Sequence, residues 1–210
     1  MKQFDRFLQG WRIRKALPYI ACGSRVLDIG TADGALFRAF QKLGDSVGID
    51  MELDRGKLPD LPHVRFYQGL FPDDLPGPRS FDVITMLATL EHIPPNYLDG
   101  LATACAEHLQ PGGHLIITVP SPAVDHILPV LKRLGLIDGM ATEQHHGFDV
   151  RQTPAIFGPK NFILVARRSF QLGLNHLFVF RLAAPAPLAT DSSFVRPSGG
   201  DLSGDQCQAS

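Results

Sequence analysis

Short apolar runs that alternate with helical segments constrain the fold of this chain more than any other feature. Five such runs precede residue 120 and cover residues 25–29, 46–50, 64–68, 81–87 and 114–119. Apolar runs of this length between helices are typical of βαβ units, whose strands pair in parallel and are buried on both faces. The pattern therefore predicts an α/β fold in which helices cover both faces of a mostly parallel sheet.

Two further apolar runs, 162–166 and 176–181, are separated by only about ten residues. That separation is too short for the crossover helix that joins two parallel strands. We therefore expect an antiparallel hairpin, which gives seven strands and places the last one antiparallel in an otherwise parallel sheet.

Helix signals stand between these runs. Residues 35–43 end at Gly44, a C-cap, and residues 96–109 end before Pro111. The second segment places its apolar residues on one face: Leu98, Leu101, Ala102, Cys105 and Leu109. A further helix is expected within 121–139 and a short one near Thr153 and Pro154, and the loop between them, 143–149, contains two histidines.

The chain reads as one domain over residues 1–182. Residues 183–210 are rich in Ala, Pro, Ser, Gly and Asp, a composition that predicts a disordered tail. Residues 4–20 interleave aromatic and basic side chains and predict a helix. This N-terminal segment, 1–22, is interpreted as a lid over the pocket, as an amphipathic contact to a membrane or lipid substrate, or as a helix packed on the sheet edge with a solvated basic face. The last interpretation is favoured.

Composition narrows the possible partners. The net charge of −1 gives no basic footprint for nucleic acid, and no apolar run approaches the roughly 20 residues that span a bilayer. The N-terminus has no signal-peptide core, which predicts a cytoplasmic protein. Cys22, Cys105 and Cys207 form no ligand pattern, and no metal site is expected.

A glycine-containing turn follows the first strand. It runs from Asp28 through Gly30, Thr31 and Ala32 to Gly34 and opens a helix, an arrangement that lets a ligand approach the backbone. Asp50 ends the second strand, 20 residues after Gly30, where an acid commonly accepts hydrogen bonds from ribose hydroxyls. The glycines do not fit the GxGxxG pattern of dinucleotide sites, which weakens that alternative.

The segment Asp-Ile-Gly-Thr-Ala-Asp-Gly at 28–34 resembles the DxGxGxG motif of class I S-adenosylmethionine-dependent methyltransferases of the small-molecule type. The segments 81–85, 90–93 and 109–115 resemble that family's fourth strand, the segment after it and the turn into the fifth strand. The resemblance covers about residues 24–182. It implies a Rossmann-like sheet, S-adenosylmethionine as the cofactor and a small-molecule methyl acceptor.

The resemblance also implies roles for individual residues. The turn from Gly30 to Gly34 would approach the methionine end of the cofactor, with Asp28 holding that end and Asp50 binding the ribose. Met51 would pack against adenine, and Met86 or Leu87 would line the pocket beside the methyl group.

This sequence departs from the family pattern at two places. Ala32 replaces the central glycine, and its methyl group is expected to exclude a positive φ and the closest ligand approach. After the third strand, Gly69 and Leu70 stand where many relatives have an acid after the glycine, so backbone groups, Gln68 or Asp73 would hold adenine.

Methyl transfer needs a base only if the acceptor begins protonated. His92 after the fourth strand and His145 or His146 after the fifth are the candidates, with His146 first, because an imidazole accepts a hydroxyl proton near neutral pH. Structural roles for these histidines remain open. Residues 124–134 and their continuation to Met140 are the expected acceptor wall.

The resulting hypothesis is methyl transfer to an oxygen, or less favourably a nitrogen or carbon, of a small metabolite. A binding module without turnover is the alternative, and a nicotinamide-dependent oxidoreductase ranks third. The sequence identifies neither the acceptor nor the oligomeric state.

Overall fold

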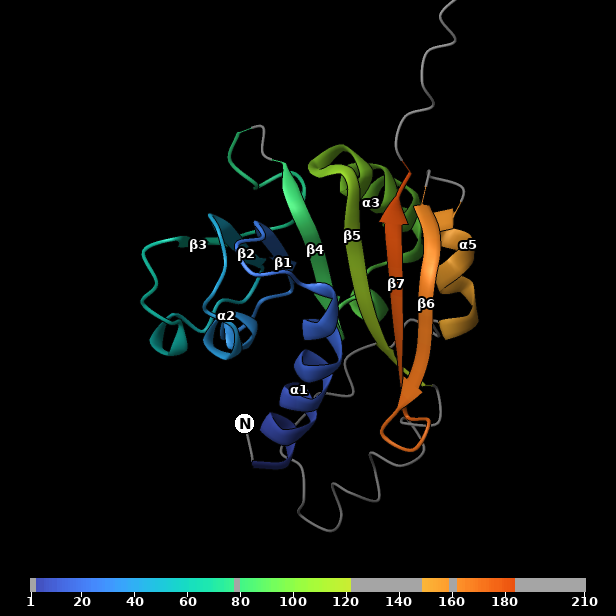
Figure 1. Cartoon of the computed structure of the whole chain (residues 1–210), viewed down its shortest axis with the longest axis horizontal. Helices are drawn as coiled ribbons and strands as arrows, with labels where there is room; N and C mark the ends of the chain where they lie inside the picture. The colour runs from blue at the N-terminus through green and yellow to red at the C-terminus, as the bar shows by residue number, and fades with distance from the viewer. Residues whose placement is uncertain (1–2, 78–79, 122–148, 159–161, 184–210) are drawn as a thin grey trace, which may run out of the picture.

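A seven-stranded sheet organises the computed structural model, which describes residues 3–77, 80–121, 149–158 and 162–183 (Figure 1). The strands lie in the order β3-β2-β1-β4-β5-β7-β6. Their bounds are β1 Val26–Ile29, β2 Ser46–Asp50, β3 Val64–Gln68, β4 Phe81–Leu87, β5 Leu109–Pro120, β6 Phe162–Phe170 and β7 Asn175–Leu182. The expected α/β architecture is confirmed.

The first five strands are parallel, and β7 is the antiparallel strand. Leu27 of β1 lies opposite Val47 of β2 on one side and Ile84 of β4 on the other. β7 pairs antiparallel with both β5 and β6, so the predicted hairpin and the inserted last strand are confirmed. Because β1 to β5 run in one direction, their carboxyl ends share one edge of the sheet, the carboxyl edge.

Helices cover both faces of the sheet. The α-helices are α1 Gln3–Ala16, α2 Ala35–Ala39, α3 Pro95–His108 and α5 Thr153–Phe157, and the 3-10 turns are η1 Leu17–Tyr19, η2 Arg55–Lys57, η3 Leu90–His92 and η4 Val150–Gln152. One buried cluster joins the sheet to α3 and α5, and the other joins it to α1 and α2 (Figure 1). The apolar strands are therefore buried on both faces, as their sequences predict.

The helix α3 confirms the apolar face expected for residues 96–109. Leu98, Leu101, Ala102 and Cys105 are all buried, and so is Leu109, the first residue of β5. The apolar spacing identified this helix because one side of it packs on the sheet.

Two element boundaries differ from the prediction. The helix expected at 35–43 ends at Ala39, because Phe40 is extended and Lys42 and Gly44 instead form backbone hydrogen bonds with the segment before β1. The fifth strand begins at Leu109 rather than His114, since Leu109 already pairs with Phe81 and the intervening residues form an irregularity in the ladder.

The other predicted segments fall in different parts of the chain. A short helix does begin at Thr153. The helix expected in 121–139, the acceptor wall at 124–140, both loop histidines and the tail from residue 184 lie outside the described residues. Within the described part of the chain, no helix is both long and apolar enough to cross a membrane.

Candidate functional site at the carboxyl edge

The turn after β1 crosses over the end of β2. The backbone N–H groups of Gly30 and Thr31 donate to the Ile49 carbonyl at 2.9 and 3.3 Å, and Gly34 N–H donates to the Thr31 carbonyl at 2.8 Å. Gly30 and Gly34 have φ angles of +79° and +70°. These left-handed conformations favour glycine and explain both positions in the motif.

Ala32 corrects one expectation. Its φ is +46°, so the methyl group does not exclude the left-handed region. Such a conformation costs a residue with a Cβ roughly 1–2 kcal/mol. The surrounding hydrogen bonds hold the turn in the geometry that glycine would adopt more easily.

Asp50 is oriented by two backbone donors. Ala32 N–H donates to Asp50 Oδ2 and Glu52 N–H donates to Asp50 Oδ1, each at 2.8 Å. A carboxylate oxygen accepts more than one hydrogen bond, so each oxygen keeps a free acceptor position. The carboxylate is fixed in place yet able to receive two adjacent hydroxyl groups.

Asp28 forms the buried floor of the turn. It is 4% exposed and accepts a hydrogen bond of 2.6 Å from the Thr85 hydroxyl of β4. Burial raises the pKa of Asp28 to about 6, against the opposing effect of the Thr85 and Thr31 hydroxyls. A carboxyl group with this pKa responds strongly to a cationic group placed beside it.

Two exposed apolar side chains stand next to Asp50. Met51 is 60% exposed after β2, and Leu70 is 50% exposed after β3. Gln68 lies between them in sequence and is already engaged, donating to the Met51 carbonyl at 3.2 Å and accepting from Arg55 at 3.3 Å. Met51 and Leu70 therefore offer apolar surface for a flat ligand group at this edge.

The turn after β3 is closed by Asp74, next to Asp73. Asp74 Oδ2 accepts the Leu70 N–H at 2.8 Å. The motif comparison missed this residue because its role is a local turn contact, for which an acid four residues after the donor is a weak signal. Gly69 lies against it: a Cβ there would meet the Asp74 side chain at 2.4 Å.

The loop after β4 packs against the turn after β1. Thr89 donates its hydroxyl to the Ile29 carbonyl at 3.2 Å, and a Cβ on Gly30 would lie 2.2 Å from Thr89 Oγ1. Met86 is fully buried in the core, whereas Leu87 is half-buried, which makes Leu87 the better placed of the two to line a pocket. His92 is exposed.

Glu91, in the same loop, is a site residue that the motifs did not reveal. It is 4% exposed, and burial raises the pKa of its carboxyl group to about 7. Its position beside His92 in the sequence gave no indication of this burial.

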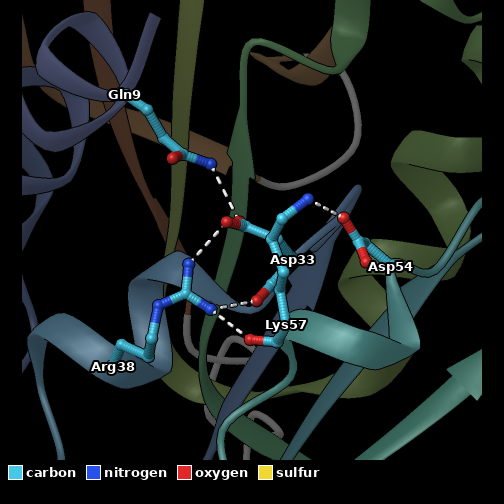
Figure 2. Close-up of polar contacts among 5 residues, drawn as sticks. All are labelled: Gln9, Asp33, Arg38, Asp54 and Lys57. Atoms are coloured by element: carbon cyan, nitrogen blue, oxygen red, sulfur yellow. Dashed lines mark hydrogen bonds and ion pairs between the residues drawn. The ribbon is translucent and has the colours of Figure 1, made fainter. Parts of the chain in front are cut away.

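Asp33 connects four segments, as Figure 2 shows. Its Oδ1 accepts from Gln9 of α1 at 3.1 Å, and its Oδ2 pairs with Arg38 of α2 at 2.5 Å. Arg38 also donates to the Lys57 carbonyl at 2.6 Å, and Lys57 pairs with Asp54. The network fixes the outer side of the turn, and its contact between Gln9 and Asp33 joins residues 24 apart in sequence.

Comparison with known proteins shows the family of this chain. A family model described as a methyltransferase domain matches residues 3–153. The ubiquinone biosynthesis O-methyltransferase of Xanthomonas campestris pv. campestris strain B100 is 37% identical over 115 residues, which cover 50% of this chain and 45% of the relative. The corresponding protein of Cupriavidus pinatubonensis is 32% identical over 104 residues, with coverages of 46% and 41%. The chain thus spans about half the length of these relatives.

Solved structures support the fold. A SAM-dependent methyltransferase of Methanosarcina mazei superposes with a TM-score of 0.58 at 16% identity, covering 81% of this chain and 98% of its own. The N-methyltransferase NodS of Bradyrhizobium japonicum superposes with a TM-score of 0.57 at 18% identity, with coverages of 86% and 97%. At these identities the likeness concerns the arrangement of strands and helices.

Proposed function

This chain belongs to the methyltransferase domain family, and on that premise we propose that it transfers a methyl group from S-adenosylmethionine to an oxygen atom of a small metabolite. The names of the O-methyltransferase relatives favour oxygen over nitrogen or carbon. The observation that carries the proposal is the carboxylate of Asp50, held by two backbone donors beside the left-handed turn at Ala32.

The residues of the carboxyl edge suit this cofactor. Asp50 has free acceptor positions for the two ribose hydroxyls, and Met51 and Leu70 expose apolar surface for the adenine ring. Asp28, buried beneath the turn, would act on the charged methionine end. Backbone carbonyls, Gln68 or Asp73 remain the proposed groups for the edge of adenine, because the N–H groups of Gly69 and Leu70 already donate to the Asp50 carbonyl and to Asp74.

When bound, S-adenosylmethionine supplies a methyl group on a sulfonium, a good leaving group for in-line displacement. The protein aligns the acceptor oxygen and excludes water. Leu87 would contribute apolar wall beside the reacting atoms. His92, His145 and His146 remain the proposed bases for a protonated acceptor, and residues 124–140 remain the proposed acceptor wall.

Domain extent, location and partners are part of the same proposal. We take residues 1–182 as the catalytic domain, 1–22 as its N-terminal segment and 183–210 as a tail outside it. We propose a cytoplasmic location, a small-molecule acceptor and no metal cofactor, with α1 packed on the sheet.

Isothermal titration calorimetry tests the cofactor half of the proposal. Wild-type protein should bind S-adenosylhomocysteine, and Asp50→Ala should bind it at least about tenfold more weakly, because the proposed hydrogen bonds to the two ribose hydroxyls are lost. Absence of binding to the wild type would falsify the proposal. Binding without S-adenosylhomocysteine production across phenol, catechol and carboxylate acceptors would favour the binding-module alternative.

A further inference from the structure

The amino half of α1 bridges two separate parts of the carboxyl edge. Gln9 donates to Asp33, in the turn after β1, at 3.1 Å. The Leu8 carbonyl accepts from Gln171, in the turn between β6 and β7, at 3.3 Å. The amino end of α1 lies at the same end of the molecule as this second turn (Figure 1). Because β4 and β5 stand between β1 and β7 in the sheet, these two contacts span the carboxyl ends of both central strands.

The sheet face under α1 becomes polar toward this edge. Val26, Val83 and Ile116 lie on this face, in the buried cluster that includes residues of α1. Side chains two positions apart on a strand share a face. The next residues of the same face on β1, β4 and β5 are polar and at most 4% exposed: Asp28, Thr85 and Thr118. A ligand reaches Asp28 from this face only after a covering segment has moved.

The two halves of α1 are held by different kinds of contact. Among the described side chains of the helix, those in the buried cluster are Ile13 and Ala16, with Trp11 packed against it, and all three follow Gly10. Before Gly10, Phe7 is 51% exposed, and the neighbouring contacts to the rest of the domain are the two hydrogen bonds described above. Apolar burial therefore anchors the carboxyl half, whereas the amino half is held by polar contacts that water can replace.

Gly10 marks the boundary between these halves. It lies inside the helix, where glycine is less favourable than alanine. A Cβ at this position would meet no atom within 4 Å, so packing does not require glycine here. Its remaining effect is to make α1 easier to bend or unwind at this residue.

We propose that residues Gln3–Gln9 form a cover, hinged at Gly10, that closes over the carboxyl ends of β4 and β5 and opens to let ligands enter and leave. Gating of the cofactor rests on the proposed function, whereas the opening movement itself does not. Lids of this kind exclude water from a closed site and set the rate of ligand exchange.

Cysteine labelling measures the opening without any ligand. Thr118→Cys places a thiol on the covered face, opposite Leu87 of β4 and Leu177 of β7 in the ladder. Modification by iodoacetamide, located by mass spectrometry, gives its rate separately from that of Cys105. Cys105 is fully buried in α3 and reports unfolding of the domain. The introduced thiol should react at least about tenfold faster than Cys105, because local opening costs less than unfolding.

Two changes in α1 should move this rate in opposite directions. Gly10→Ala stiffens the hinge and should slow labelling about fivefold, as expected from helix propensity. Gln9→Glu places a second carboxylate against Asp33, which keeps its ion pair with Arg38, and should speed labelling about fivefold. Gly100→Ala is the matched control: Gly100 is a glycine of α3 at which a Cβ would also meet no atom within 4 Å, and its replacement should leave the rate unchanged.

Surface plasmon resonance with S-adenosylhomocysteine tests the gate in the chain with Thr118 intact. Gly10→Ala should slow both association and dissociation about fivefold while the Kd changes less than about twofold, because the cover opens for both steps. Gln9→Glu should speed both steps. A residue that merely contacts the ligand would instead change the Kd.

Equal labelling of the introduced thiol and Cys105 would overturn the cover, as would equal rates in Gly10→Ala, Gln9→Glu and Gly100→Ala. If circular dichroism shows that Thr118→Cys is unfolded, Leu87→Cys on the neighbouring strand takes its place. Slower labelling with unchanged ligand exchange in Gly10→Ala would overturn the gate. If the wild type binds no S-adenosylhomocysteine, the proposed function fails, and the labelling rates still decide whether the cover opens.

Discussion

Ala32 donates its backbone N–H to Asp50 at 2.8 Å while holding a φ of +46°. The hydrogen bond requires the left-handed turn, and the turn is strained for any residue with a Cβ. The Asp50 carboxylate, which we propose binds the ribose, is thus oriented by a backbone N–H at a position that favours glycine.

Replacing Ala32 with glycine should stabilise the protein. Glycine removes roughly 1–2 kcal/mol of strain from the left-handed conformation. This gain outweighs the loss of about 0.4–1 kcal/mol of stability that follows from the greater conformational entropy of glycine in the unfolded chain. Urea unfolding of Ala32→Gly should therefore show a gain of about 0.5–1 kcal/mol. Ala39→Gly at the exposed end of α2 is the control and should destabilise. A loss of stability at position 32 would contradict the strain assigned to it.

Gly30 should not tolerate a side chain. A Cβ there would lie 2.2 Å from Thr89 Oγ1 and 2.5 Å from Thr89 Cγ2, and the residue has a φ of +79°. Gly30→Ala should lower the thermal midpoint by more than about 8 °C, equivalent to roughly 3 kcal/mol or more in a domain of this size. Adding Thr89→Ala removes both nearest atoms and should restore part of the loss. Equal stability of the single and double variants would mean that the backbone, rather than Thr89, sets the cost.

Asp28 should make stability depend on pH. Its pKa rises from 3.8 to about 6 on folding, because burial disfavours the charged form. Below the lower value the carboxyl is protonated in both states; between the two values the unfolded state loses its proton first, so stability falls as pH rises from about 4 to about 6 and then stays level. The total loss from this group is roughly 3 kcal/mol.

Asp28→Asn removes that titration. Asp28→Asn should therefore become more stable relative to the wild type as the pH rises from 4 to 8. Urea unfolding of both proteins at each pH measures this difference in unfolding free energy. Glu91, whose pKa also rises on folding, still titrates in both proteins and cancels in the difference. A difference independent of pH would show that Asp28 titrates normally.

Asp50→Asn should weaken S-adenosylhomocysteine binding while preserving the fold. The amide keeps one acceptor oxygen for a backbone donor but loses the negative charge and an acceptor toward the ribose. We expect a loss of about tenfold by calorimetry, or roughly 1.4 kcal/mol. Asp54→Asn, which alters a nearby acid paired with Lys57, should bind normally. Similar losses in both variants would indicate a general charge effect rather than a contact of Asp50.

The sequence predicted the parts of the structure that depend on local pattern. All seven strands follow from their apolar runs, and the hairpin follows from the short link before Asn175. The helix after Gly34 was predicted too long, because residues 40–44 pair with the segment before β1 and no helical pattern encodes that competition.

The candidate site divides in the same way. Asp28 and Asp50 were predicted because each lies at or near the end of a strand, and the apolar runs of the sequence show where these strands end. The contact of Asp33 with Gln9 was missed because the two residues are 24 positions apart in sequence. A buried carboxyl such as Glu91 is recognisable only once the loop after β4 has been placed in the fold.

The position of β7 has a consequence for biosynthesis. β5 and β6 each pair with β7, whose Phe178 and Phe180 are fully buried. When synthesis has reached the end of β6, the edge of β5 that pairs with β7 is therefore still exposed, and the space that Phe178 and Phe180 occupy in the core is empty. Exposed strand edges and apolar surface promote aggregation during folding. The domain reaches its protected state only after Leu182 has emerged, and a chain interrupted before that residue becomes a substrate for chaperones and proteases.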